Sequence, residues 1–400
     1  MPHERKRHLT PIVVQALKAS SIVGVIGHRQ TGKTTLCEHL SQDMRTLDRE
    51  EDLILCESGP NDFISNRPAP FMIDECQLSP RLFPALKDYV RTHKKPGQFL
   101  LTGSIRFTSR KAIRESLTGR VLITELLPMT WSESHSLPLN PLLIELHQKG
   151  LSALPRELKP RLSESESGML RYLELGGLPG ICFGRNAQHR ASKFRTHLDT
   201  LLDRDLRLIV ETTLPKMTLL ALISTLARTQ GSILHWESLR RETGISTITL
   251  KKLFSALEAL FLIRPMSQLG QSTPDTFYFE DAGLAKFLAN QSSEFLTLQG
   301  FTHFLFCNLR EGYHYTDGLQ YSTHSYRTRG GAYVPLIFQA FGRPLAIIPT
   351  LDRQASLSSL KSAESFLKAH PSGYALIVHL GKETKVLHTR LASLPWNVLI

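Results

Sequence analysis

The most constraining feature of the sequence is the octapeptide Gly-His-Arg-Gln-Thr-Gly-Lys-Thr at residues 27–34. It matches the phosphate-binding pattern G-x-x-x-x-G-K-[ST] at every position. An apolar run at residues 22–26 precedes it and predicts a buried strand, and apolar or small residues at helical spacing follow over residues 35–40. Because a strand and a helix both flank the loop, a phosphate-binding loop is a better explanation than a chance glycine turn.

Each residue type in this loop has a physical role. Gly27 and Gly32 permit backbone conformations that a Cβ would block, so that successive N–H groups can point at phosphate oxygens beside a helix N-terminus. Lys33 is predicted to lie on the β- and γ-phosphates of ATP, and the hydroxyl of Thr34 is predicted to bind Mg²⁺. The other candidate nucleotide contacts in and next to the loop are His28, Arg29, Gln30, Thr31 and Thr35.

A second apolar run, over residues 71–73, ends in the two acids Asp74 and Glu75. We expect Asp74 to hold Mg²⁺ through water, and Glu75 to orient and deprotonate the water that attacks ATP. Acids at a strand end also cap helices, and a helix is predicted to begin near Pro80. With the phosphate loop upstream, the catalytic interpretation is the stronger one.

Three further strands are predicted, at residues 52–56, 98–101 and 121–126. Thr102 and Ser104 follow the second of these strands. Polar side chains at the carboxyl end of a strand beside a phosphate loop can respond to the γ-phosphate. We therefore expect one of these two hydroxyls to sense whether ATP or ADP is bound.

An arginine that stabilises transition-state charge, supplied by a neighbouring subunit, is a further expectation for an ATPase. The candidate is Arg120, ahead of the alternatives Arg106 and Arg114. The competing interpretation for all three is that of ordinary surface cations.

Composition narrows the class of protein. A chain of 400 residues is long enough for two or three domains. The 48 Lys and Arg residues exceed the 36 Asp and Glu residues, for a net charge of +12. This charge favours an acidic partner such as nucleic acid or nucleotide. A basic protein without a polymer partner is an equally weighted alternative, because charge alone does not specify binding.

The cellular setting is predicted from three observations. The five cysteines are scattered without a Cys-x-x-Cys pair, which suggests thiols in a reducing compartment. The polar, basic N-terminus is unlike a signal peptide. No run reaches 18 apolar residues, so no transmembrane helix is expected. Together these features predict a cytoplasmic protein without a membrane partner.

The order of the motifs resembles that of a known family. The phosphate loop is followed by Ile-Asp-Glu-Cys-Gln, Leu-Thr-Gly-Ser, Ser-Leu-Thr-Gly-Arg and Glu-Leu-Leu-Pro-Met-Thr. This series resembles the prokaryotic AAA+-like P-loop ATPases that carry a C-terminal domain of unknown function. The resemblance implies ATP and Mg²⁺ as ligands, a winged helix, and a tail with the PD-(D/E)XK nuclease fold. A homo-oligomer, as a ring or otherwise, is a further expectation.

The predicted fold class is α/β, with a parallel-sheet P-loop NTPase domain of AAA+-like type, an α-rich winged-helix domain and a small α+β nuclease-like domain. The predicted boundaries place the ATPase at residues 1–133, a helical connector at 134–210, the winged helix at 211–290 and the nuclease-like domain at 291–400. Within the connector, residues 203–205 (Asp-Arg-Asp) either contact the ATPase or lie on a solvated helix face.

The winged helix is predicted from helical patterns at residues 217–229, 236–242 and 250–260, with wing strands at 261–263 and 276–279. This arrangement can place polar and basic side chains in the major groove of DNA. The candidates are Thr247, Thr249, Lys251 and Lys252. A winged helix used only for packing is slightly favoured over DNA binding.

The tail lacks the residues of a nuclease site. When the Tyr-Arg pair at residues 326–327 is aligned with the family, the metal-binding acids fall at Pro335 and Ile348, and the lysine falls at Thr350. The stretch 332–350 contains no Asp, Glu or Lys. None of these side chains can ligate Mg²⁺ as a carboxylate does. A degenerate, non-cleaving nuclease-like domain is therefore predicted.

These observations predict Mg²⁺-dependent ATP binding and hydrolysis, with a cellular target that the sequence does not identify. The alternative is a nucleotide-gated, DNA-binding regulator without significant turnover. DNA cleavage is disfavoured because of the residues at the three tail positions.

Overall fold

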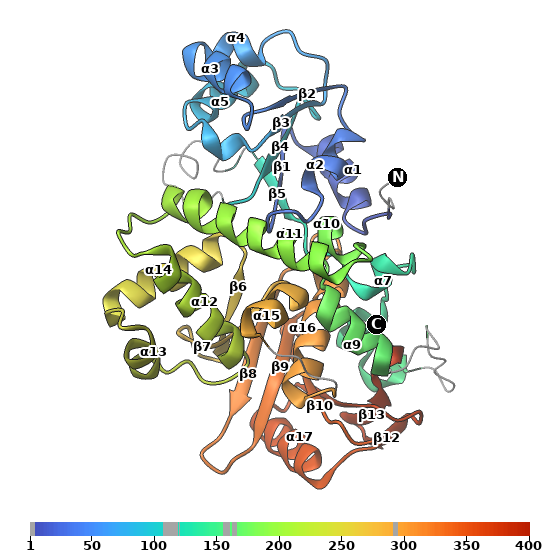
Figure 1. Cartoon of the computed structure of the whole chain (residues 1–400). Coiled ribbons are helices and arrows are strands. Elements are labelled where there is room, and N and C mark those ends of the chain that lie inside the picture. Colours follow the sequence, from blue (N-terminus) through green and yellow to red (C-terminus); the bar gives the residue numbers. More distant parts are fainter. Residues whose placement is uncertain (1–4, 107–118, 120, 155–160, 162–165, 291–294) are drawn as a thin grey trace. The chain divides into compact units, whose positions relative to one another are not determined.

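The computed structural model describes residues 5–106, 119, 121–154, 161, 166–290 and 295–400 (Figure 1). The chain forms two compact units, each assembled from three stretches of sequence. The first comprises Met1–Met129, Leu178–Leu219 and Ser246–Leu262. The second comprises Thr130–Gly177, Leu220–Ile245 and Ile263–Ile400. The domain boundaries expected from the sequence stay predictions.

A five-stranded parallel sheet forms the centre of the first unit, with strand order β2-β3-β4-β1-β5. Its strands are β1 (Ile22–Ile26), β2 (Asp43–Thr46), β3 (Phe71–Asp74), β4 (Phe99–Gly103) and β5 (Val121–Glu125). The three inner strands β3, β4 and β1 are buried along their whole length, which explains their continuous apolar sequences. This sheet confirms the predicted α/β fold class.

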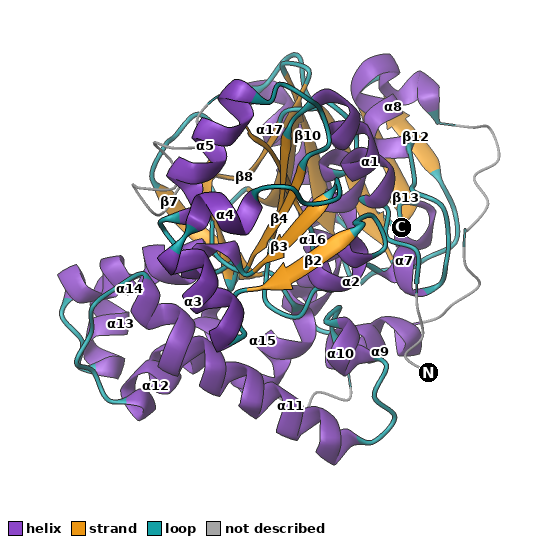
Figure 2. Cartoon of the chain, turned by 90° about the horizontal axis from the view of Figure 1, so that it is seen from above, coloured by secondary structure: helices purple, strands orange, loops and turns teal. Residues whose placement is uncertain are grey.

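Helices surround this sheet (Figure 2). They are α1 (Thr10–Ala19), α2 (Lys33–Glu38), α3 (Glu50–Ser58), α4 (Pro60–Ile64), the single 3₁₀ turn η1 (Cys76–Leu78) and α5 (Leu82–Thr92). In α5, Leu82, Leu86 and Val90 recur every four residues and are buried, so one face of the helix packs into the core. Phe71 and Phe83 belong to the same core cluster.

The strand predicted at residues 52–56 is wrong, because these residues lie in helix α3. Glu50, Glu51 and Asp52 occupy the first turn of α3, where negative charge is favoured by the helix dipole. The apolar run then divides: Cys56 is buried, whereas Ile54 and its neighbour are more than half exposed. The strand that the sheet uses instead is β2, whose half-buried polar sequence suits an edge position.

Later parts of the chain complete the first unit. They are α10 (Pro179–Cys182), α11 (Ala187–Thr200), the π-helical segment η4 (Leu201–Asp205), the 3₁₀ turn η5 (Leu206–Leu208) and α14 (Thr247–Ala259). The Asn186 side chain accepts a hydrogen bond from the backbone N–H of His189 and so caps α11. Phe261, directly after α14, belongs to the core cluster of the sheet.

An eight-stranded mixed sheet forms the second unit, in the order β12-β13-β11-β10-β9-β8-β6-β7. Its strands are β6 (Ile263–Gln268), β7 (Pro274–Phe279), β8 (Tyr321–Arg327), β9 (Tyr333–Ala340), β10 (Arg343–Pro349), β11 (Tyr374–His379), β12 (Lys385–His388) and β13 (Leu391–Pro395). Its helices are α7 (Trp131–Ser134), α8 (Leu142–Lys149), α9 (Glu166–Leu175), α13 (Trp236–Thr243), α15 (Ala282–Ala289), α16 (Leu298–His314) and α17 (Leu357–Ala369). Short 3₁₀ turns, η3 (Gly150–Ala153) and η6 (Trp396–Val398), complete it.

The elements predicted for a winged helix are present near the predicted positions. Helix α12 (Lys216–Thr229), α13 and α14 follow one another, and strands β6 and β7 follow them. Strand β6 also pairs with β8, through Ser267 opposite His324, so the two wing strands continue the sheet of the tail. The element order is therefore confirmed, and the assignment of a winged helix stays a prediction.

The tail positions examined for metal ligands lie in the middle of the second sheet. Pro335 is buried in β9, Ile348 is buried in β10, and Thr350 follows directly after β10. None of the three side chains carries a carboxylate or an amine, in keeping with the prediction that the tail does not cleave nucleic acid. The nuclease-like fold itself stays a prediction.

The structure bears on the predictions about cysteines and about membrane-spanning helices. The five cysteines form no disulfide. Cys37 and Cys56 are buried in the first unit, and burial raises the pKa of both thiols, so they behave as small apolar core residues. Among the described residues, no helix has both the length and the apolar character that a membrane span requires.

Candidate functional site

The predicted phosphate loop connects the end of β1 to the start of α2 in the first unit. Gly27 has a φ of 150°, and a Cβ built there would lie 2.4 Å from the carbonyl oxygen of Leu126. Gly32 has a φ of 91°, directly before α2 begins at Lys33. The loop therefore needs glycine at both positions, as the sequence pattern predicts.

Internal and external hydrogen bonds hold the loop. The Thr31 hydroxyl donates to the carbonyl oxygen of His28 at 2.9 Å. The Arg7 guanidinium donates to the carbonyl oxygens of Thr31 at 2.5 Å and of Leu127 at 2.7 Å. Arg7 thus links the loop to the segment that follows β5, a role that no sequence pattern indicates.

The Lys33 ammonium lies inside the loop. It donates to the carbonyl oxygens of Gly27 at 3.0 Å and of His28 at 2.9 Å. Burial lowers the pKa of Lys33, and the nearby carboxylates of Glu75 and Asp74 oppose this effect. A cation held in the loop beside two acids is the arrangement expected for a lysine that binds phosphate.

The Asp74 carboxylate, at the end of β3, is surrounded by hydroxyl groups. Thr34 donates to its two oxygens at 3.0 and 3.2 Å, Thr46 donates at 3.4 Å, and Thr102 donates as well. Burial raises the pKa of Asp74, and the hydrogen bond from Thr102 is the largest effect in the opposite direction. The structure therefore brings the predicted metal-binding pair, Thr34 and Asp74, into direct contact.

This pair fits Mg²⁺. A hydroxyl oxygen and a carboxylate are hard oxygen ligands, and a magnesium ion in an ATP site takes only one or two protein ligands in addition to water and phosphate oxygens. Thr34 and Asp74 would hold such an ion, and the ion would neutralise charge on the phosphates. Thr46 is a further hydroxyl in the same group that the sequence prediction missed.

Glu75 adopts a left-handed backbone conformation, with φ 52° and ψ 40°, immediately after β3. Its side chain accepts hydrogen bonds from Ser104 at 3.1 Å and from the Gln77 amide, and its N–H donates to the Thr102 hydroxyl at 3.3 Å. A non-glycine residue in this conformation is uncommon and is found at functional sites. The turn directs the two adjacent acids to different sets of partners.

Opposing influences act on the charge of Glu75. Burial would raise its pKa, but the charge of Lys33, the hydrogen bond from Gln77 and the charge of Arg29 outweigh burial, and the pKa lies below its usual value. Glu75 is therefore ionised at neutral pH. Gln77 was missed from the sequence because a glutamine after two acids carries no distinctive pattern; only the turn η1 brings its amide back to the carboxylate.

The remaining predicted residues have different surroundings. Gln30 and Thr35 are exposed. Arg106 stacks on the ring of Phe261 at 4.4 Å, donates to the Glu258 carbonyl oxygen at 3.3 Å and lies 3.7 Å from the Glu125 carboxylate. Arg106 therefore supports packing within the first unit. The preferred candidate, Arg120, and its alternative Arg114 lie outside the described residues.

Residues from the predicted connector contact the loop and its surroundings. Asp205 accepts a hydrogen bond from Arg29 at 3.4 Å, and Arg204 lies 2.8 Å from Asp48. His197 of α11 stacks on His28, with ring centroids 5.0 Å apart. Of the two alternatives left open for residues 203–205, contact with the ATPase holds for Arg204 and Asp205, whereas Asp203 pairs with Lys216.

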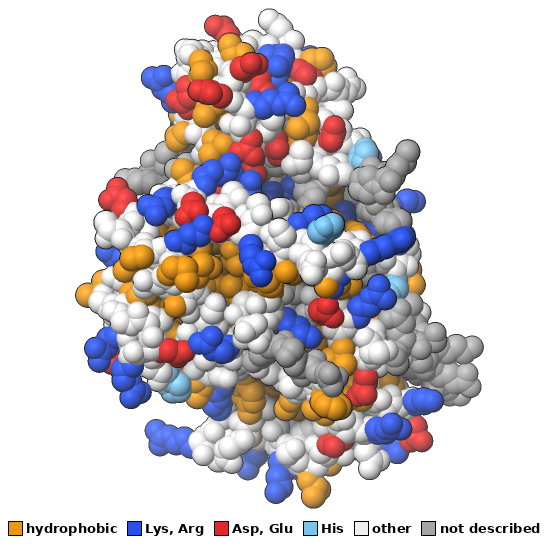
Figure 3. Space-filling model, viewed as in Figure 1, with side chains coloured by type: hydrophobic (Ala, Val, Ile, Leu, Met, Phe, Trp, Pro, Cys, Tyr) orange, Lys and Arg blue, Asp and Glu red, His pale blue; other side chains and the backbone are white. Residues whose placement is uncertain are grey.

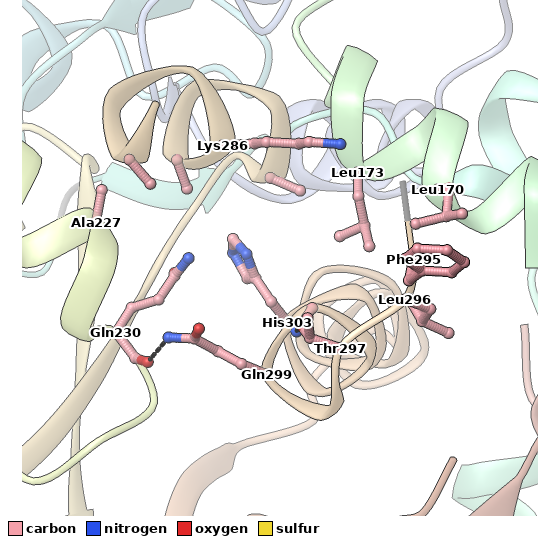
Figure 4. Close-up of a pocket in the computed structure, with 14 residues that line it drawn as sticks. Leu170, Leu173, Ala227, Gln230, Lys286, Phe295, Leu296, Thr297, Gln299 and His303 are labelled. Atoms are coloured by element: carbon pink, nitrogen blue, oxygen red, sulfur yellow. Dashed lines mark hydrogen bonds between the residues drawn. The ribbon is translucent and has the colours of Figure 1, made fainter. Parts of the chain in front are cut away.

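The second unit contains a small cavity, drawn in Figure 4, of about 60 Å³. Apolar side chains of α9 and α15 line it together with His303, whose Nε2 donates to the Phe279 carbonyl oxygen at 2.8 Å. Burial lowers the pKa of His303 to about 4, so its ring is neutral at pH 7. The volume is well below the roughly 300–1,000 Å³ of typical ligand pockets, and none of the predicted nucleotide contacts lines it.

Comparison with known families agrees with this site. The AAA domain family matches residues 19–135, which contain the phosphate loop and both acids. A family defined as a domain of unknown function (DUF8612) matches residues 167–294. The first match supports a P-loop ATPase family and ATP binding. The second names no activity, so the winged helix and the nuclease-like tail stay predictions.

Curated relatives include the uncharacterized proteins Rv2008c of Mycobacterium tuberculosis and Mb2031c of Mycobacterium bovis. Each is 27% identical to this chain over 286 residues, which cover 68% of this chain and 56% of the relative. The chain thus spans about half the length of these relatives.

Two solved structures show weak likeness to the chain. The Walker-type ATPase PABY2304 of Pyrococcus abyssi has 13% sequence identity and a TM-score of 0.40, over 70% of this chain and 94% of that chain. The signal-transduction ATPase PH0952 of Pyrococcus horikoshii, with a tetratricopeptide repeat sensor, has 14% identity and a TM-score of 0.28, over 79% of this chain and 49% of that chain. TM-scores this low do not establish a shared fold.

Proposed function

We propose that this chain hydrolyses ATP to ADP and inorganic phosphate in a Mg²⁺-dependent reaction. The observation that carries the proposal is the placement of Glu75, which directly follows Asp74 of the Thr34–Asp74 pair and is held by Ser104. Binding of ATP alone needs the loop, Lys33 and the metal-binding pair. A second acid, held apart from that pair by its own hydrogen bonds, adds what a hydrolytic reaction needs, namely a group that can orient and deprotonate water.

The proposed roles follow from the contacts. Lys33 would place a cation against the β- and γ-phosphates, and Thr34 and Asp74 would hold Mg²⁺, which would neutralise phosphate charge. A water molecule attacks the γ-phosphorus, its proton passes to the Glu75 carboxylate, and the bond from the γ-phosphorus to the bridging oxygen of ADP breaks. The Lys33 charge and the hydrogen bonds from Gln77 and Ser104 lower the pKa of Glu75, so the carboxylate is charged and can both orient the water and accept its proton.

The decisive experiment compares turnover with binding in Glu75→Gln. The amide preserves the size of the side chain and can still hydrogen-bond to Ser104, but it cannot take a proton. Phosphate release should fall by about two orders of magnitude or more, while the Kd for ATP should stay within a few-fold of the parent value. The exposed Glu38→Gln, on α2 of the same unit, is the matched control and should retain parent turnover. Unchanged phosphate release in Glu75→Gln would contradict the proposal.

A second candidate, a nucleotide-gated regulator that binds DNA, has one observation in its favour. Helix α14 begins with an Ser246 cap and exposes Lys251 and Lys252 near its start. In helices α12 and α13, Arg228 pairs with Glu242 and Arg240 pairs with Glu237. On the face drawn in Figure 3, the described Lys and Arg side chains are interspersed with acidic ones and form no continuous stripe.

DNA binding can be tested separately from turnover. If α14 reads DNA, the double variant Lys251→Ala Lys252→Ala should weaken duplex binding and reduce its salt dependence. The variant should hydrolyse ATP at the parent rate. An ATPase rate that is unaffected by added DNA, together with equal DNA binding by parent and variant, would leave the hydrolase as the only supported function. A homo-oligomeric state and a cytoplasmic location stay predictions.

A further inference from the structure

Arg29, the third residue of the phosphate loop, is bound outside the loop. Its Nη1 lies 3.4 Å from Oδ2 of Asp205, which is close to the upper limit for a hydrogen bond. The Arg29 side chain retains 21% of its exposure, whereas the Asp205 side chain retains 3%. A partly exposed guanidinium in a long contact is able to leave its partner when a stronger acceptor is offered.

The buried charge of Asp205 has a second positively charged partner besides Arg29. Its other oxygen, Oδ1, accepts a hydrogen bond from Nε of Arg204 at 2.9 Å, and Arg204 also lies 2.8 Å from Asp48. A buried carboxylate that loses its only cation is strongly destabilised. Because Arg204 stays in place, Arg29 can move away without leaving Asp205 unpaired.

Arg29 also lies close enough to influence the catalytic groups. Burial raises the pKa of Glu75 and lowers that of Lys33, and the positive charge of Arg29 lowers both values. The charge of Glu75 in turn raises the pKa of Asp205. The charge of Arg29 therefore acts on both acids, Glu75 and Asp205, and its side chain contacts Asp205.

The segment that carries Asp205 is unusual in its backbone. Asp205 ends the π-helical segment η4, which follows α11 without a break. π-Helical turns within longer helices are rare and occur frequently at functional sites. Helix α11, which leads into this segment, also contacts the loop, because the ring of its His197 stacks on His28. Both ring nitrogens of His197 are buried and have no hydrogen-bond partner among the described residues.

We propose that Arg29 is the arginine that binds the γ-phosphate of ATP, supplied from within the same chain, and that Asp205 holds Arg29 when no γ-phosphate is present. The inference rests on the proposed function, because it adds a residue to the same nucleotide site. A guanidinium binds phosphate oxygens in a bidentate way, so the γ-phosphate is a stronger partner than one carboxylate oxygen at 3.4 Å. The nucleotide state thereby determines whether the residue 197–205 segment holds the loop.

The test compares the Kd values for ATP and ADP in a Glu75→Gln background, where ATP stays intact during the measurement. Arg29→Ala should weaken ATP binding by about tenfold and change ADP binding by less than about twofold, because ADP has no γ-phosphate. The ATP affinity of Arg29→Lys should lie between that of the background and that of Arg29→Ala, since an amine keeps the charge but cannot form the bidentate contact. Asp205→Asn should strengthen ATP binding relative to ADP by a few-fold, because Arg29 no longer has to leave a carboxylate.

The matched control is Arg67→Ala. Arg67 forms a half-buried ion pair with Asp43 at the same distance, 3.4 Å, in the same unit but outside the loop. Its ATP-to-ADP affinity ratio should equal that of the background. Retained ADP binding shows that each variant is folded.

Two results would overturn the inference: equal loss of ATP and ADP affinity in Arg29→Ala, or an unchanged affinity ratio in Asp205→Asn. Failure of the proposed hydrolysis is distinguishable from both. In that case the parent chain would release no phosphate from ATP, yet the affinity ratios would still shift as expected.

Discussion

Three ionisable side chains of the candidate site share a region from which water is largely excluded. Lys33, Asp74 and Glu75 are each no more than 8% exposed. Burial disfavours the charged form of all three, and their opposite charges partly restore it. A site that binds a polyanion with buried charges is sensitive to the loss of any one of them, because the others then lack a partner.

Lys33→Ala should weaken ATP binding by at least about tenfold, because the variant lacks the cation that faces the phosphates. Isothermal titration with ATP and Mg²⁺ measures this directly. Lys94→Ala is the control, since Lys94 is an exposed lysine of the same unit and its loss changes the net charge equally. Equal ATP affinity in Lys33→Ala and Lys94→Ala would show that the loop does not bind phosphate.

Gln77→Ala should move the acid limb of the rate profile to higher pH. The Gln77 amide donates a hydrogen bond to the Glu75 carboxylate and lowers the pKa of Glu75. Removal of the amide should therefore raise this pKa, and Glu75 should lose its charge at a higher pH. The measurement is kcat as a function of pH from about 3 to 8, a range that extends below the usual glutamate pKa.

The lowered pKa of Glu75 also affects how the stability of the folded protein depends on pH. A carboxylate whose pKa is lowered by folding stabilises the native state above its unfolded pKa, and this stabilisation is lost as the pH falls through the folded value. Gln77→Ala should therefore reduce stability at neutral pH and less so in acid. Gln42→Ala, at an exposed position of the same unit, should leave both profiles unchanged. If kcat fell at the same acidic pH in the parent and in Gln77→Ala, Gln77 would have no influence on the charge of Glu75.

At the scale of elements, the phosphate loop was predictable because its requirements are local. Gly27 and Gly32 are needed for backbone reasons, and the strand before them and the helix after them are read from adjacent residues. The prediction of a strand at 52–56 was wrong because the apolar residues there suit a strand or a helix. The acids just before them stabilise a helix through its dipole. Strand β2 is polar and lies at an edge, so no apolar pattern marks it.

The parts of the site that could not be predicted depend on distant segments. Arg7 and His197 contact the loop from positions outside it in the sequence, and nothing in their own neighbourhoods indicates a ligand site. For Asp205, the sequence left a contact with the ATPase and a solvated helix face as alternatives, and only the structure identifies Arg29 as its partner. A single sequence carries information on spacing and periodicity. It does not state which helix of a later segment packs beside which loop.

Gly27→Ala tests the backbone requirement of the loop. The new Cβ would meet the Leu126 carbonyl oxygen at 2.4 Å, and alanine rarely adopts a φ of 150°. The free energy of unfolding should fall by about 1–3 kcal/mol or more, and ATP binding should weaken because the loop must rearrange. Urea unfolding measures the first effect. Gly180→Ala, which meets no atom within 4 Å, is the control and should be near neutral; equal stability of the two variants would contradict the loop geometry.

At the scale of the whole molecule, the two units are interleaved along the chain. The chain passes from one unit to the other after residues 129, 177, 219, 245 and 262. The first unit, which contains the predicted ATPase, therefore includes residues that follow the phosphate loop by more than two hundred positions. Phe261 is the clearest example, since it is buried in the core cluster of the five-stranded sheet and stacks on Arg106.

Phe261→Ala should destabilise the unit that binds nucleotide, although residue 261 lies far outside the predicted ATPase boundary. Truncation of a buried phenylalanine costs about 3–5 kcal/mol. Unfolding monitored by bound fluorescent ATP should show the loss at a lower urea concentration than in the parent. Phe341→Ala, whose side chain is 48% exposed in the second unit, should have little effect. Identical urea midpoints for the two variants would show that Phe261 does not stabilise the unit that binds nucleotide.

Interleaving also constrains how such a chain can change over generations. A gene segment that encoded only residues 1–129 would omit Asp205, Phe261 and the helices that carry or precede them. Recombination at one breakpoint, or insertion of the ATPase as a single cassette, would therefore divide both units at once. Variation in this protein should accumulate by point substitution and by insertions in surface loops, and the two units should be inherited together.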